Sequence, residues 1–130
     1  MGTQENAELV RRGYEAFVAG DMATLNELFA EDAVWHVPGS GELSGAKQGR
    51  EAIMSFFGEL MTRSGGTLKV TLQDVIGGDA HTIGLNGNHA ERNNKVLDQD
   101  AVLVFQVRDG RVSEVREFFE DTAATDEFWS

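Results

Sequence analysis

Cysteine is absent from the 130 residues of this sequence. Its absence excludes disulfide bonds, zinc sites built from thiolates and cysteine nucleophiles together, and it suits a reducing compartment. No apolar run approaches the ~20 residues that span a bilayer, and residues 1–9 lack the basic segment and apolar stretch of a secretory signal. We therefore expect a cytoplasmic protein with no membrane segment.

Basic residues are also scarce: 11 lysines and arginines face 22 aspartates and glutamates, for a net charge of −11. This charge repels phosphate backbones and anionic lipids, so neither nucleic acid nor a membrane is an expected partner. The sequence also has no Asp-x-Asp-x-Asp calcium loop, and its glycine-rich stretches lack the Lys-Ser or Lys-Thr end of a phosphate loop. His81 and His89 fall on one predicted strand, about 27 Å apart, which is too far to share a metal. We expect no metal and no cofactor.

The remaining composition, 41% hydrophobic and 25% charged, is that of an ordinary globular domain. Apolar residues at helical spacings predict helices over 5–19, 22–29 and 50–63. Alternating or short apolar segments between turn residues predict strands over 33–37, 67–76, 81–91, 96–107 and 111–120. Residues 38–49 are interpreted as a loop near a pocket mouth, and 121–130 as a short polar tail.

This order of elements predicts an α+β fold in one domain, 1–130. A long antiparallel sheet with helices for only one face tends to curl around them, so we expect a curved antiparallel sheet wrapped around three N-terminal helices, with an internal pocket. The uncovered sheet face predicts a homodimer.

Several short segments carry a family resemblance: LFAEDAVW at 28–35, GREAI at 49–53, DGRV at 109–112 and DEFW at 126–129, with Gly20-Asp21 after the first helix. With these, the chain resembles the SnoaL-like, ketosteroid-isomerase-related group of the nuclear-transport-factor-2-like superfamily. The resemblance covers nearly the whole chain and implies a cone-shaped fold and a dimer. The fold hosts isomerases, cyclases, hydrolases, dehydratases and binding proteins, so it does not fix an activity.

The ketosteroid isomerase pattern is not preserved. Where that pattern implies a carboxylate base, a tyrosine and a protonated aspartic acid, this sequence has Val37, Gly13 and Leu103. Tyr14 lies one residue from the tyrosine position, about 100° around a helix.

Two other family patterns fit in part. The limonene-epoxide-hydrolase pattern maps onto Asn86, Asn88 and Glu117, of which only Glu117 is an acid; the amides could orient a water or a carbonyl oxygen. The polyketide cyclase pattern, with one acidic base near the end of the last strand, maps onto Glu120 or Asp121. Side chains alternate along a strand, so only one of these two can face inward.

Glu117 is the strongest catalytic candidate from the residues themselves. Alternation places it on one strand face with Val115 and Phe119, and a carboxyl group on an apolar face has its pKa raised by desolvation. The alternative is a structural ion pair with a basic neighbour such as Arg92.

His36 is a second candidate, because an imidazole can transfer protons near neutral pH. If Trp35 and Val37 face inward, His36 points away and is structural. Pro38 directly follows the strand and could change which side faces in, so both interpretations stay open.

Large apolar side chains are expected to build the core, and some of them to line the pocket. The predicted ligand-contacting residues are Tyr14, Trp35, Phe57, Asn86, Asn88, Leu103, Phe105 and Phe119. Two functions follow: an acid/base enzyme (isomerase, cyclase or hydrolase type) acting on a small hydrophobic carbonyl or polyketide-like compound, or a ligand-binding or accessory domain without catalysis. An enzyme of this type needs a carboxylate or imidazole inside the pocket, whereas a binding protein does not.

Overall fold

A computed structural model describes residues 2–130, which form four helices and six strands. The helices are α1 (Thr3–Ala19), α2 (Met22–Leu28), α3 (Arg50–Arg63) and α4 (Thr122–Trp129). The strands are β1 (Phe29–Val37), β2 (Gly45–Gln48), β3 (Lys69–Gly77), β4 (Thr82–Arg92), β5 (Lys95–Arg108) and β6 (Arg111–Phe119).

Local sequence signals set the ends of the helices. Gly20 adopts the left-handed conformation, with φ of 71°, and ends α1 as a C-terminal glycine commonly does. The carboxylates of Asp21 and Asp121 accept backbone hydrogen bonds from Thr24 and Ala124, at 3.1 and 3.0 Å, and so cap α2 and α4.

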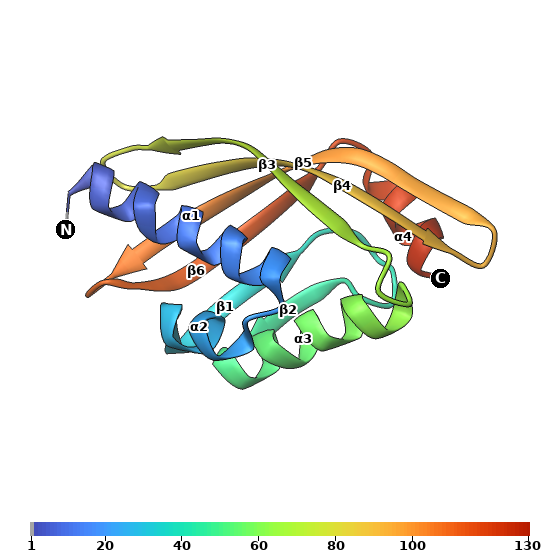
Figure 1. Ribbon diagram of the computed structural model, residues 1–130, viewed down its shortest axis with the longest axis horizontal. Coiled ribbons are helices and arrows are strands. Elements are labelled where there is room, and N and C mark those ends of the chain that lie inside the picture. Colours follow the sequence, from blue (N-terminus) through green and yellow to red (C-terminus); the bar gives the residue numbers. More distant parts are fainter. Residues whose placement is uncertain (1) are drawn as a thin grey trace.

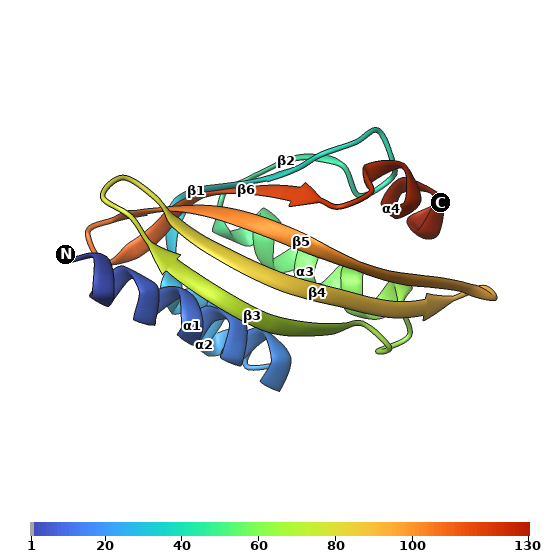
Figure 2. The same ribbon diagram turned by 90° about the horizontal axis from the view of Figure 1, so that it is seen from above.

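One curved sheet joins all six strands in the order β2-β1-β6-β5-β4-β3 (Figures 1 and 2). Neighbouring strands are antiparallel except β1 and β6, which run parallel. The β4–β5 hairpin turns at Asn93 and Asn94, with φ of 50° and 64°, a conformation that asparagine adopts more readily than most residues.

Helices α1, α2 and α3 pack on the concave face of the sheet, while α4 lies beyond the end of β6 (Figure 1). Alternation along the strands directs one set of side chains into the space between sheet and helices, as in β1, where Ala33, Trp35 and Val37 are buried. The fully buried side chains Val10, Ile53 and Val115 come from α1, α3 and β6, so one core joins the two layers. In the described part of the chain, no helix is long and apolar enough to cross a bilayer.

The predicted α+β class, with a curved sheet around N-terminal helices, is confirmed. Four details differ. The segment 38–49 contains strand β2, the polar tail contains helix α4, β1 begins four residues earlier than predicted, and its parallel pairing with β6 makes the sheet mixed rather than antiparallel. Neither β2 nor α4 has a strong apolar period. Strand β2 is held by pairing with β1, and the start of α4 by the hydrogen bond that the Asp121 N–H donates to Gln99 of β5.

Candidate functional site

An apolar cavity of about 120 Å³ lies between the sheet and the helices. Aromatic and aliphatic side chains from α1, α3 and the inner faces of β1, β5 and β6 form most of its wall. The predicted residues Phe57, Leu103, Phe105 and Phe119 are among them. Polar groups are few, so each one strongly influences what the cavity can bind.

Glu117 is the carboxylic acid that β6 presents to this cavity. It is paired with Leu103 of β5, and its neighbours on the same face are Val115 and Phe119. The indole Nε1–H of Trp35 donates a hydrogen bond of 3.1 Å to its Oε1. No protein partner is found for Oε2 among residues 2–130, so this oxygen is free to contact a ligand.

Burial raises the pKa of Glu117 to about 7, because the apolar wall solvates a carboxylate poorly. The hydrogen bond from Trp35 acts in the opposite direction and lowers the pKa, but it is the weaker effect. A carboxyl group with this pKa is divided between acid and base at neutral pH, which suits a group that both takes up and returns a proton.

Aromatic packing fixes Trp35 in the orientation that reaches Glu117. Its ring stands perpendicular to that of Phe57, with centroids 5.3 Å apart, and it also packs on Phe29 and Phe56. These edge and tilted contacts are the arrangements that aromatic quadrupoles favour. The indole N–H is therefore held in position before any ligand arrives.

A second set of polar side chains, from α1 and β4, also lines the cavity. The Tyr14 hydroxyl donates a hydrogen bond of 2.8 Å to Oδ1 of Asn86, and Nδ2 of Asn86 donates one of 2.9 Å to Oδ1 of Asn88. Burial, and secondarily the negative charge of Glu117, raises the pKa of Tyr14 far above its usual value. Tyr14 therefore stays a hydrogen-bond donor throughout the working pH range.

The Tyr14 ring fits the cavity because residue 84 of β4 is glycine. A Cβ atom at Gly84 would lie 2.8 Å from the Cε2 atom of Tyr14, closer than real side chains pack. The missing side chain thus leaves space for the tyrosine, which also packs edge-on against Phe105. No sequence pattern indicates this role of Gly84, because only the fold brings α1 over β4.

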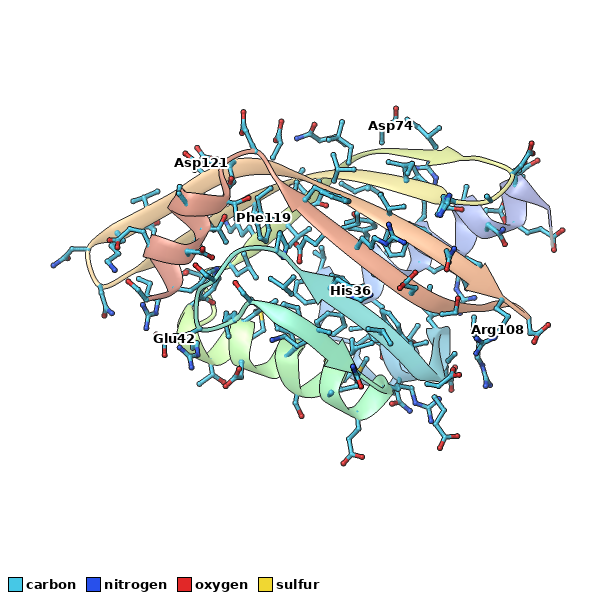
Figure 3. All side chains as sticks on the ribbon, turned by 180° about the vertical axis from the view of Figure 1, so that it is seen from behind. His36, Glu42, Asp74, Arg108, Phe119 and Asp121 are labelled. Carbon is cyan, nitrogen blue, oxygen red and sulfur yellow. The ribbon has the colours of Figure 1, made fainter. Side chains whose placement is uncertain are left out.

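The structure corrects the prediction for His36. Its ring lies on the outer face of β1, is 43% exposed and forms a 2.9 Å contact with Glu114 (Figure 3). Trp35 and Val37 face inward, so normal alternation is kept up to Pro38 and the histidine is excluded from the cavity.

Glu120 and Asp121 also lie outside the cavity, which corrects a second prediction. The Glu120 carboxylate accepts a hydrogen bond from the backbone N–H of Asp100, and Asp121 caps α4 (Figure 3). Both groups stabilise the connection between β6 and α4. The alternative partner proposed for Glu117 is also corrected: Arg92 donates instead to the carbonyls of Phe128 and Ser130.

Asp126 of α4 also lines the cavity, although no sequence pattern predicted it. Its carboxylate accepts a hydrogen bond from the backbone N–H of Ser40, at 3.0 Å, and lies 3.4 Å from the hydroxyl of Ser44, which donates to the Pro38 carbonyl. Residues 38–44 and α4 thus meet at one end of the cavity, where Trp129 also lies. The DEFW segment was a signal for the family, but nothing in it indicated this contact.

Metal ligands do not gather at the site: residues 2–130 contain no group of three or more His, Cys, Asp or Glu side chains that could hold an ion.

A family model described as a SnoaL-like domain matches residues 10–115, most of the chain. The chain belongs to the SnoaL-like family. The uncharacterized protein Rv0034 of Mycobacterium tuberculosis is 37% identical over 131 residues, and the match covers all of both chains. This SnoaL-like protein therefore has relatives that match it from end to end.

Solved structures share the fold. Bal32a, from a soil-derived mobile gene cassette, is 48% identical with a TM-score of 0.96, covering 98% of each chain. TerC, co-crystallized with polyporic acid, is 22% identical with a TM-score of 0.83, covering 96% of this chain and 98% of its own. At that identity the likeness to TerC shows the fold alone.

Proposed function

We propose that this SnoaL-like protein is an acid/base enzyme that moves a proton on the carbon next to a carbonyl group of a small, apolar compound. The single observation that carries the proposal is Glu117: a carboxyl group in an apolar cavity, with its pKa raised to about 7 and one oxygen free of protein partners. Of the four predicted acid/base residues, it alone lines the cavity.

In the proposed reaction, the Glu117 carboxylate takes a proton from the carbon and leaves its electron pair in an enolate, whose negative charge rests on the carbonyl oxygen. The resulting carboxylic acid then returns the proton to the same or a neighbouring carbon. Atoms and charge balance without a second reactant. Trp35 holds the carboxylate in place through Oε1, and the free Oε2 takes the proton.

The test uses 2-tetralone, a bicyclic aromatic ketone with acidic protons beside its carbonyl. In deuterated water, we expect the protein to speed deuterium uptake at this carbon, measured by NMR. The rate should rise with pH and level off above about 7, because the carboxylate form of Glu117 is the base. Glu117→Gln should lower the rate by at least about a hundredfold.

Glu120→Gln is the matched control, since it removes an acid from the same strand end but outside the cavity. Its exchange rate should equal that of the natural protein. No protein-dependent exchange, or equal rates in the Glu117→Gln protein, would overturn the proposal. Binding of 2-tetralone without exchange would favour the other function considered, a ligand-binding or accessory domain without catalysis.

A further inference from the structure

The hydrogen bonds among Tyr14, Asn86 and Asn88 have a direction. A protonated tyrosine has one hydrogen to donate, and it goes to Oδ1 of Asn86. This bond leaves Nδ2 of Asn86 to donate, and that group bonds Oδ1 of Asn88. Each link fixes the orientation of the next amide.

The series ends on the Nδ2 group of Asn88. Asn86 is almost fully buried, at 2% exposed, and both of its amide atoms are already bonded. Asn88 is only half-buried and lines the cavity, and no partner for its Nδ2 group is found within residues 2–130. Two N–H donors of this cavity-lining amide are therefore free to contact a ligand.

From this geometry we infer that the Asn88 amide binds the oxygen atom of the substrate, and that Tyr14 and Asn86 are positioning residues that orient it. The ligand class is an apolar molecule with a hydrogen-bond-accepting oxygen, such as a ketone or a quinone. An amide with free donors in an otherwise apolar cavity wall favours such an oxygen, because without it the donors stay unpaired.

This inference rests on the proposed function for the role of the oxygen in the reaction: negative charge that develops there is stabilised best by donors already in place. Recognition of the oxygen can nevertheless be measured without turnover. Glu117→Gln should retain it while losing proton exchange.

The experiment is a double-mutant cycle between Asn88 and the ligand oxygen. Its probes are 2-tetralone and tetralin, the same bicyclic hydrocarbon without the oxygen, and dissociation constants come from NMR titration. Asn88→Leu, which is close in shape and has no donor, should weaken the binding of 2-tetralone on the order of tenfold relative to the binding of tetralin. Asn26→Leu, a change at an exposed asparagine of α2, should leave the ratio unchanged.

Tyr14→Phe tests the positioning role, because it removes the hydroxyl and keeps the ring. The side-chain amide signals of Asn88 should shift in the free protein, and the preference for 2-tetralone should fall part of the way toward that of Asn88→Leu. A merely structural tyrosine would change stability without moving these signals.

Three results would overturn the inference: an unchanged ratio of dissociation constants in Asn88→Leu, no shift of the Asn88 signals when 2-tetralone binds, or no binding of either probe at its solubility limit. Proton exchange that persists with an unchanged ratio would reject this inference and keep the proposed function. A changed ratio of dissociation constants without proton exchange would keep this inference and reject the proposed function.

Discussion

At the scale of single residues, Glu117 should make stability depend on pH. The folded-state pKa of about 7 lies above the ordinary value of 4.5, so the folded protein holds this proton more tightly than the unfolded chain does. Stability from this group is complete below about pH 4.5 and is lost as the pH rises through about 7. Relative to the natural protein, Glu117→Gln should therefore gain roughly 2–3 kcal/mol between about pH 5 and pH 9.

Urea unfolding of both proteins at the two pH values measures this difference. Glu120→Gln controls for the loss of one negative charge from an acidic chain and should not reproduce the gain. Parallel pH profiles for the natural and Glu117→Gln proteins would show that the cavity does not disfavour the carboxylate.

The position of Glu117 was predictable, and its partners were not. Period-two alternation around Val115 and Phe119 is a local signal, and it placed the acid on the inner face of its strand. The bond to Trp35 and the contact of Tyr14 with Gly84 join residues about 70 to 80 positions apart, so they depend on how the sheet curves. No local pattern encodes such a fit.

At the scale of elements, strong periodicity and clear stop signals were sufficient to predict a helix and its bounds. Elements without these signals were not predicted. Helix α3 has the predicted bounds, Arg50–Arg63, because an apolar face ends at the Ser64-Gly65-Gly66 stop signal. Helix α4 was not predicted because most of its residues are polar and only its two buried aromatics, at the C-terminal end, indicate an apolar face. Asp121 is nevertheless a good capping residue. Its hydrogen bonds to β5, such as that between Gln99 and Thr125, are tertiary and could not be foreseen.

Helix α4 should hold residues 38–44 against one end of the cavity through Asp126. Asp126→Ala removes the acceptor for the Ser40 N–H, so we expect faster amide hydrogen exchange at Ser40, together with faster binding and release of 2-tetralone. The loss in stability should be about 1 kcal/mol.

Glu127→Ala is the matched control on the same helix, because Glu127 is 70% exposed and its carboxylate contacts Lys95 rather than the loop. Hydrogen exchange followed by NMR distinguishes the two variants. Asp126→Asn, which keeps one acceptor oxygen, should restore most of the protection at Ser40. Slow amide exchange at Ser40 in Asp126→Ala would contradict the prediction, because it would mean that other contacts hold the loop.

At the scale of the whole molecule, the outer face of the sheet is apolar where three strands meet. The registers place Leu85, Val102 and Phe118 in one row across β4, β5 and β6, and the Phe118 side chain is among the exposed large hydrophobics, at 51%. None of the helices α1, α2 and α3 covers this face, since they pack on the concave side (Figure 2). Such a patch on a sheet commonly marks a contact between proteins.

We expect this row to be the centre of a homodimer, because a two-fold axis near Val102 would bring the same patch of two copies together. Phe118→Glu should give a monomer by light scattering after size exclusion, since it places a charge at the contact. It should leave the cavity intact, because the side chains of Phe118 and Glu117, neighbours on β6, point to opposite faces of the sheet. Val96→Glu, at an exposed valine near the β4–β5 hairpin, should remain a dimer.

The net charge of −11 on each chain opposes association, so added salt should favour the dimer. A natural protein that is monomeric at micromolar concentration in moderate salt would contradict this expectation.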